Sequence, residues 1–366
     1  MGITPRKIFT DYVRGESDKP FIVSPFLPHY PVLESVMKEL KINATGDFVA
    51  DEIAVSKELN YLPMFMTDLT GLIFKWDIDE VESTPNAKIS KIHTKKGDWI
   101  RKDIISDVKW SNEEGCPVKS EADHHMVAAV CDEISTKEND IRKYFRDWRE
   151  RVGEDGVIVI GHPHPSWLAY QINPQDIFVH WMDYEDAFRH SMDAIFKASL
   201  FVMNIAVQEG IDFMSDSSYG LEMTSPQLFE DMDLPYIKAF ADWTHEHNSL
   251  FWYHNCGLTR KFIMNGDFNR LGCDVYETVS PPPAGDNDLA ESRKYLDKSI
   301  CSKGNLDLVL LRDGKAEDVI QATRNIVHAV KGYKHIVSTA DAVLTGTPPE
   351  NFIGHIQAAN EEIAKL

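Results

Sequence analysis

The second half of the chain repeats one pattern, in which a short apolar run precedes an amphipathic helical stretch. We expect strands at 157–160, 212–215, 250–254, 274–276, 308–311 and 335–337. Helical stretches follow at 184–210, 225–247, 259–271, 289–300, 316–331 and 349–365. Strands that alternate with helices lie parallel and are joined by right-handed crossovers. The number of such units favours a closed (β/α)8 (TIM) barrel of α/β class over an open sheet.

The first 150 residues are less regular than the rest of the chain. A short strand is expected at 21–25. Residues 64–105 alternate apolar and polar side chains and are broken at 84–86 and 96–98, which predicts an antiparallel meander over the barrel. We therefore expect one domain over residues 1–366. Residues 1–150 would carry an N-terminal antiparallel β/helical elaboration and the first barrel elements, and 151–366 the regular units.

Charge and composition exclude several classes of function. The formal charge is −20, and basic residues form only short stretches such as Lys95-Lys96, so nucleic acid, anionic membranes and polyanionic substrates are poor partners. No apolar run reaches transmembrane length and no signal peptide is apparent, which predicts a cytoplasmic enzyme. The five cysteines lack CxxC spacing, which argues against a disulfide framework. The absence of GxGxxG and P-loop motifs gives a nucleotide-binding role no support.

The segment Tyr253-His254-Asn255-Cys256-Gly257, at the end of the strand expected at 250–254, is the most informative. TIM barrels carry catalytic groups at the carboxyl ends of their strands. Positions i and i+2 of a strand face the same side, so His254 and Cys256 should point together into the barrel mouth. An imidazole and a thiolate side by side suit zinc. A core histidine and a buried cysteine would have the same spacing, so the spacing leaves both interpretations open.

A third metal ligand must come from another strand. Asp341 follows the strand at 335–337, and a carboxylate oxygen is an acceptable zinc donor; a capping or turn role is the alternative. Asp216 and Glu222 follow the strand at 212–215. Either carboxylate would reach the same mouth as a ligand or a proton donor, or else lie on a surface loop.

Other imidazole and aromatic side chains follow the first strands and are candidates for substrate contact. These substrate-binding candidates are His29, His162, His164, Trp167 and Tyr170. Core packing is the alternative for the aromatic residues. His124 and His125 lie in an acidic stretch, which predicts a solvated helix face instead.

A set of short segments occurs in the order seen in the uroporphyrinogen decarboxylase superfamily. The segments are Asp212-Phe213-Met214-Ser215-Asp216, Thr224-Ser225-Pro226-Gln227-Leu228-Phe229, Leu234-Pro235-Tyr236-Ile237-Lys238, His254-Asn255-Cys256-Gly257, Gly272-Cys273-Asp274, Gly304-Asn305-Leu306-Asp307 and Thr347-Pro348-Pro349-Glu350-Asn351. The chain resembles this superfamily over about residues 155–366 and more loosely before them. Each segment alone is weak, but the ordered set is specific and implies a TIM barrel.

Two chemistries compete within that superfamily. The decarboxylase proper must bind a tetrapyrrole with eight carboxylates, and its pattern includes an arginine-rich N-terminal segment. The corresponding loop here, residues 25–31, has no arginine, and a chain of charge −20 would repel such a substrate. A lyase that acts on a carboxylated substrate is therefore the alternative interpretation.

The favoured interpretation is the branch of zinc methyltransferases that work with corrinoid proteins. That branch carries His-x-Cys-Gly at this strand end, which His254, Cys256 and Gly257 match. The branch completes its zinc site with a cysteine, and counting back from Thr347 puts Asp341 at that position. The resemblance thus implies Zn²⁺ held by His254, Cys256 and Asp341. With a carboxylate in place of the branch's second thiolate, this site would be a harder set of ligands than that of the branch.

The same resemblance implies methyl transfer between a small donor and the cobalt of a separate corrinoid protein. The chain lacks a DxHxxG-type motif for binding corrinoid, so this cofactor would arrive on the partner. The density of aromatic residues and Asp341 favour O-demethylation of a methoxylated aromatic or similar O-methyl compound. Asp216, Tyr219, Glu222 or the metal would then stabilise the leaving oxygen. The sequence leaves the donor, the direction and the oligomeric state, including a homodimer, open.

Overall fold

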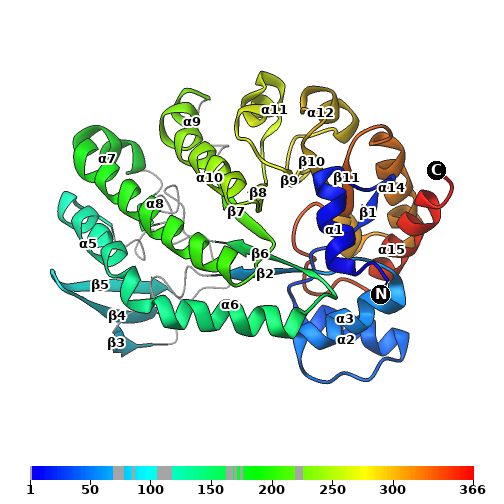
Figure 1. Cartoon of the computed structure of the whole chain (residues 1–366), viewed down its shortest axis with the longest axis horizontal. Coiled ribbons are helices and arrows are strands. Elements are labelled where there is room, and N and C mark those ends of the chain that lie inside the picture. Colours follow the sequence, from blue (N-terminus) through cyan, green and yellow to red (C-terminus); the bar gives the residue numbers. More distant parts are fainter. Residues whose placement is uncertain are drawn as a thin grey trace.

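The structure is a computed structural model in which residues 2–68, 78–84, 87–104, 118–161, 168, 171–173, 176–218 and 226–366 are described. Eight parallel strands curl into a (β/α)8 barrel, which confirms the predicted fold class (Figure 1). In hydrogen-bonded order the strands are β1 (Ile22–Val23), β11 (His335–Thr339), β10 (Cys301–Leu306), β9 (Val275–Thr278), β8 (Leu250–Asn255), β7 (Phe213–Ser217), β6 (Val157–Gly161) and β2 (Met64–Asp68). A hydrogen bond of 2.9 Å from Leu62 N, just before β2, to Val23 O of β1 links the first and last strands of this order.

Helices cover the outside of the barrel, and the first helix lies at one end of it (Figure 1). The helices before β7 are α1 (Pro5–Arg14), α2 (Tyr30–Leu40), α3 (Phe48–Leu59), α5 (Glu121–Asp132), α6 (Glu138–Val152), α7 (Ile177–Asp183) and α8 (Glu185–Gln208). Those after β7 are α9 (Pro226–Met232), α10 (Leu234–Glu246), α11 (Arg260–Asn265), α12 (Leu289–Tyr295), α13 (Leu308–Asp313), α14 (Ala316–Ala329) and α15 (Pro349–Ile363). In the described part of the chain, no helix has the length and apolar character needed to cross a bilayer.

Helix α1 closes the amino end of the barrel. Its Phe9 is fully buried and packs against two side chains of the barrel interior, with ring centroids 5.6 Å from Phe213 and 6.4 Å from Trp252. Side chains that alternate with these on the same strands, such as Met214 and Tyr253, pack outward in the core that includes the helices. Because one end of the barrel is filled, side chains at the carboxyl ends of the strands form the accessible mouth.

The meander predicted over 64–105 is correct only in part. An antiparallel sheet consists of β3 (Ile78–Ser83), β4 (Ala87–Thr94) and β5 (Gly97–Ile104). Strand β2, at the start of the same stretch, instead pairs in parallel with β6 and belongs to the barrel. Adjacent residues Met64 and Phe65 are both buried, as in a strand that is covered on both faces.

The strand predicted at 308–311 is wrong. Leu308–Asp313 forms helix α13, in which the Asp307 carboxylate accepts a hydrogen bond of 2.7 Å from Leu310 N at the helix start. The strand lies earlier, at β10, whose inward-facing residues include the polar Lys303. Because β10 has polar residues on its interior side, it lacks the continuous apolar run that marks the other strands.

His124 and His180 form a buried pair between α5 and α7. His124 is fully buried, so the predicted solvated helix face is wrong at this position. Its Nε2 lies 3.1 Å from Nδ1 of His180, and its Nδ1 lies 3.1 Å from Oγ of Ser191. Burial, together with the nearby His180, lowers the pKa of His124 to about 4. This histidine is therefore neutral in the folded protein at ordinary pH.

We expect the folded state to lose stability as the pH falls from about 6.5 towards 4. His124 keeps a lowered pKa when folded but titrates at its ordinary value when unfolded, so the unfolded chain binds more protons in this window. At about 1.4 kcal/mol per pKa unit, this residue contributes on the order of 2–3 kcal/mol to the loss.

Thermal unfolding against pH tests the expectation. His124→Gln should make the unfolding temperature depend less steeply on pH. His190→Gln, at an exposed histidine of α8, should leave that dependence unchanged. Buried His335 and His355, whose pKa values are also lowered to about 3, will leave a residual slope. Identical slopes for the wild type and both variants would contradict the assignment.

Candidate metal centre

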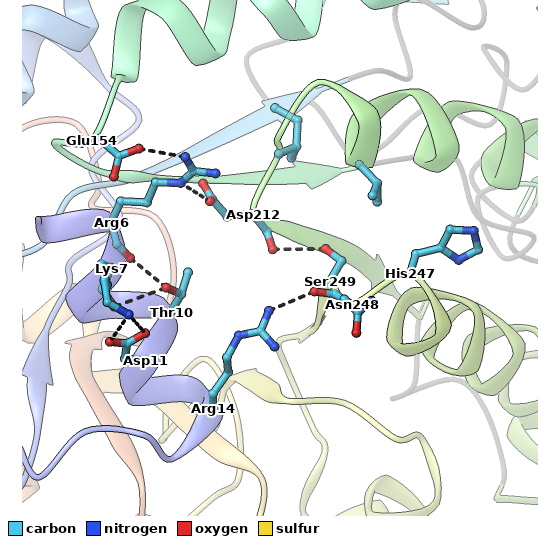
Figure 2. A pocket seen from close by; sticks show the side chains of 12 residues that line it. Arg6, Lys7, Thr10, Asp11, Arg14, Glu154, Asp212, His247, Asn248 and Ser249 are labelled. Carbon is cyan, nitrogen blue, oxygen red and sulfur yellow. Dashed lines mark hydrogen bonds and ion pairs between the residues drawn. The ribbon is translucent and has the colours of Figure 1, made fainter.

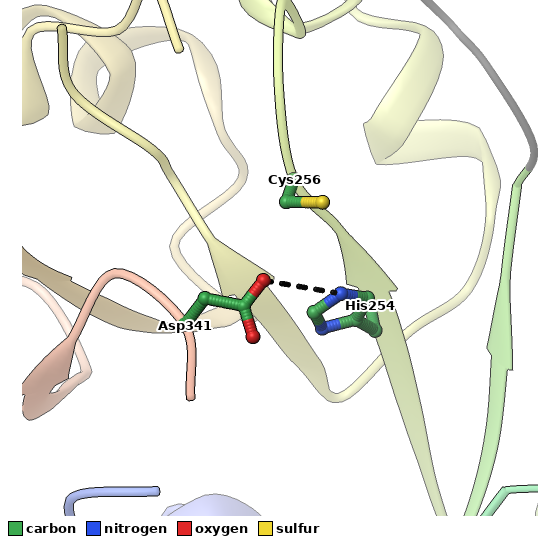
Figure 3. A group of neighbouring side chains, drawn as sticks. All are labelled: His254, Cys256 and Asp341. Atoms are coloured by element: carbon green, nitrogen blue, oxygen red, sulfur yellow. Dashed lines mark ion pairs between the residues drawn. The ribbon is translucent and has the colours of Figure 1, made fainter. Parts of the chain in front are cut away.

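The carboxyl ends of β8 and β11 bring three of the predicted residues together. His254 lies near the end of β8, Cys256 follows that strand, and Asp341 follows β11. One ligand atom from each residue lies within 4.8 Å of the others, and His254 Nε2 is 3.9 Å from Asp341 Oδ2 (Figure 3). Cys256 is exposed, and the other two side chains are partly exposed. We call these three residues the ligand group.

Strand alternation explains why the ligand group faces the barrel interior. Trp252, two positions before His254, packs in the interior with Phe213, at a ring-centroid distance of 5.4 Å. Tyr253 points the other way, into the outer core. The i, i+2 spacing that predicted a shared face for His254 and Cys256 thus corresponds to the observed geometry.

Glu277 on β9 fixes the orientation of the His254 imidazole. The two residues are opposite each other in the register of β8 and β9. Nδ1 of His254 lies 3.3 Å from Oε2 of Glu277. Because a carboxylate only accepts hydrogen bonds, Nδ1 carries the hydrogen, and Nε2 of a neutral imidazole presents its lone pair to the other two ligands.

Lys303 and Trp252 hold Glu277 in place. Lys303 is opposite Glu277 in the register of β9 and β10, and its Nζ lies 2.5 Å from Oε1 with both residues fully buried. The indole Nε1 of Trp252 donates to Oε2 at 3.0 Å. Burial raises the pKa of Glu277, but the charge of Lys303, with the hydrogen bond and charge of His254, outweighs it and holds the pKa well below the ordinary range. Glu277 is therefore a carboxylate with both oxygens occupied.

The electrostatics of the ligand group favour a positive charge at its centre. Burial lowers the pKa of His254, but hydrogen bonds with Cys256 and Glu277 and the charge of Asp341 outweigh it, and the pKa is raised well above the ordinary value. Asp341 accepts a hydrogen bond of 2.6 Å from Ala342 N at Oδ1, which leaves Oδ2 towards His254. A metal ion that bound Nε2 would displace this proton, because imidazole coordinates metals in its neutral form.

The donor set and its spacing fit a zinc-type ion. An imidazole nitrogen, a thiolate and a carboxylate oxygen are all zinc ligands. Bonds of about 2.0–2.3 Å at tetrahedral angles separate the donor atoms by about 3.3–3.5 Å, so the observed separations require shifts of about 1 Å. Three protein ligands leave a fourth position open, as in catalytic rather than structural zinc sites.

Asp216, predicted as a catalytic residue, is not part of the ligand group. On β7 it shares the outward side with Met214, and its side chain is 3% exposed. Its Oδ1 accepts a hydrogen bond of 2.7 Å from Ser217 N, and burial raises its pKa well above the ordinary value. The outward direction argues against contact with a molecule in the barrel mouth, and the catalytic role of Asp216 stays a prediction.

The predicted substrate contacts are only partly within the described residues. His29 is exposed and directly precedes α2. Its loop lies beside the segment that carries Asp341, because Val343 N donates to Phe26 O at 2.9 Å. The remaining predicted site residues lie outside the described residues; they are Tyr219, Glu222, His162, His164, Trp167 and Tyr170.

The fold and the ligand group define a TIM barrel with a candidate metal centre at the carboxyl ends of its strands. The family model described as uroporphyrinogen decarboxylase (URO-D) matches residues 166–362, which is more than half of the chain. The chain belongs to this family, as its ordered short segments predicted.

Two plant proteins match a shorter stretch of the chain. The chloroplastic uroporphyrinogen decarboxylase of Nicotiana tabacum is 29% identical over 141 residues, which is 37% of this chain and 33% of that protein. The chloroplastic uroporphyrinogen decarboxylase 2 of Arabidopsis thaliana is 30% identical over 145 residues, with the same shares. The match thus spans about one third of the length of each relative.

A solved structure is similar over nearly the whole chain. A methyltransferase from Methanosarcina mazei aligns with a TM-score of 0.65, covering 98% of this chain and 99% of its own, at 16% sequence identity. At this identity the likeness establishes a shared fold, including the segments before the family match.

Proposed function

We propose that the chain is a methyltransferase that moves a methyl group between a small molecule and the cobalt of a separate corrinoid protein. The observation that carries the proposal is the ligand group, with an imidazole, a thiol and a carboxylate within 4.8 Å at the barrel mouth. The fold shared with the Methanosarcina mazei methyltransferase supports it. Fold alone does not determine chemistry, so the ligand group is the main support for this activity.

The direction we propose is demethylation of a methoxylated aromatic or a similar O-methyl compound. The carbon–oxygen bond breaks, and the methyl carbon forms a bond with the electron pair of the partner's reduced cobalt. The ether oxygen leaves with the bonding electrons and takes up a proton. An oxygen anion is a poor leaving group, so its developing charge needs stabilisation. A bound zinc ion would supply this stabilisation as a Lewis acid.

His254, Cys256 and Asp341 would hold the ion, and Glu277 would keep His254 in the tautomer that presents Nε2. Asp341 bears on the choice of substrate. A carboxylate is a harder donor than a thiolate, and a harder site suits oxygen ligands better than sulfur ligands. This favours an oxygen leaving group over a thiol acceptor.

A spectroscopic assay tests the proposal. Zinc-loaded protein is mixed with cob(I)alamin, as a stand-in for the corrinoid protein, and a panel of methoxylated aromatics. The expected result is conversion to methylcobalamin with one phenol released per methyl transferred, and loss of both products in Cys256→Ala. Cys273→Ala, at a buried cysteine outside the ligand group, is the matched control.

The same preparation distinguishes the alternative. Release of CO₂ from a carboxylated substrate such as uroporphyrinogen, without any need for corrinoid, would support a lyase and contradict the methyltransferase. Methyl transfer from methylcobalamin to a thiol, without reaction of the aromatic ethers, would contradict only the direction and the substrate class.

A further inference from the structure

A group of lysines lies at the opposite end of the barrel from the ligand group. Four lysines, Lys19, Lys298, Lys331 and Lys334, line a pocket of about 540 Å³. These residues come from the loop before β1, the turn before β10 and the turn before β11. The pocket therefore lies at the amino ends of these strands, and we call it the lysine pocket.

The lysine pocket has an excess of positive charge. None of its lining residues has an acidic side chain. Within the part of the chain that the structure describes, none of the four lysines forms an ion pair. Lys334 Nζ donates to the carbonyl of Val13 at 3.0 Å. Leu366 also lines the pocket, and a main-chain carboxylate there would offset one of the four charges.

A fifth cation lies behind the wall of the lysine pocket. Arg293 is fully buried, with its Cζ 4.9 Å from the ring centroid of Tyr333, which lines the pocket. Its Nη2 donates to the Asp297 carbonyl at 3.4 Å, whereas Nε and Nη1 have no hydrogen-bond partner among the described residues. A buried guanidinium without a paired carboxylate is costly unless negative charge lies near it.

A neighbouring pocket at the same end of the barrel provides a comparison (Figure 2). That pocket has a volume of about 500 Å³ and contains cations and carboxylates together. Arg6 pairs with Glu154 at 2.9 Å and with Asp212 at 2.6 Å, and Lys7 pairs with Asp11 at 2.8 Å. Arg14 donates to the Asn248 carbonyl at 3.0 Å, and the acidic side chains Asp11, Glu154 and Asp212 line the same pocket. Cations and carboxylates are therefore balanced here, in contrast to the lysine pocket.

We propose that the lysine pocket binds a small anion that carries two or more phosphate groups. Lysine ammonium groups pair readily with phosphate oxygens, and several adjoining charges on one ligand are needed to match the excess in the pocket. The volume of the lysine pocket lies within the range of small-molecule sites, so the pocket can hold pyrophosphate or a nucleoside diphosphate. The negative charge of the whole chain excludes an extended anionic surface, but not a local site of this kind.

Calorimetric titration of the full chain with pyrophosphate tests the proposal. We expect one binding site, with affinity weakened at least about fivefold in Lys331→Glu and in Lys298→Glu, because each substitution replaces an attraction with a repulsion. Lys197→Glu makes the same charge change at an exposed position of α8 and should leave the affinity unchanged.

Further titrations identify the group that is recognised. Binding of ADP with no binding of adenosine is expected, since the phosphates carry the recognition; ADP that binds much more tightly than pyrophosphate would identify a nucleotide as the ligand. His254→Ala should bind pyrophosphate like the wild type, which excludes capture at the ligand group and separates this proposal from the methyltransferase one. Absence of binding, equal weakening by Lys197→Glu, or loss in His254→Ala would each overturn the proposal.

Discussion

His254→Ala is expected to lose bound zinc, from about one equivalent per chain to almost none, and to lower methyl transfer at least about 100-fold. The substitution removes the nitrogen donor at the centre of the ligand group and leaves Cys256 and Asp341 alone. Two protein ligands are too few for a zinc site of the usual kind. Elemental analysis after dialysis gives the metal content, and cobalamin spectra give the rate.

Substitutions at Asp341 separate loss of a ligand from loss of folding. Asp341→Ala should release the metal, whereas Asp341→Cys should retain it, because a thiolate is also a zinc donor. His190→Ala, at an exposed histidine of α8, should keep both metal and rate. If His254→Ala keeps a full equivalent of zinc at wild-type affinity, the ligand group is not the metal site and the proposed function loses its main support.

The ligand group was predictable because its residues are marked by their spacing within one strand or by their position just after a strand. His254 and Cys256 lie two positions apart on one strand, so alternation alone gave their shared direction. Asp341 follows β11, and the carboxyl ends of parallel strands in a barrel meet at one mouth. No knowledge of side-chain packing was needed for either step.

Glu277 and Lys303 were not predicted because their role depends on contacts between neighbouring strands. Glu277 interrupts the apolar strand β9, and Lys303 lies in β10, whose polar interior residues hid the strand itself. Their significance comes from the lateral register of three strands, which sequence periodicity does not give. A charged residue within a strand expected to be buried was the available signal.

The lysine pocket was also not predictable from sequence patterns, because its residues lie far apart along the chain. Lys19, Lys298 and Lys331 are distant in sequence, and basic residues that adjoin along the chain form only short stretches such as Lys95-Lys96. The barrel gathers the three because the amino ends of β1, β10 and β11 are neighbours in the sheet. Net charge predicts the average surface and not its local exceptions.

Lys303→Met is expected to lower the free energy of unfolding by about 3–5 kcal/mol. The substitution leaves the Glu277 carboxylate fully buried without the ammonium group that is its main countercharge, and such a loss costs far more than the loss of a surface ion pair. Lys7→Met, which breaks the largely exposed pair with Asp11, should leave the free energy of unfolding nearly unchanged. Denaturant unfolding of both variants measures the difference.

The double variant Glu277→Gln/Lys303→Met decides whether the two charges act as a unit. Glutamine removes the charge of Glu277 but keeps an oxygen that accepts from Trp252 Nε1 and His254 Nδ1. We expect the double variant to recover most of the stability that either single substitution loses, with a coupling energy of at least about 2 kcal/mol, and to retain zinc because His254 keeps its orientation. Additive losses would mean that Lys303 does not hold Glu277, and the orientation of His254 would then need another cause.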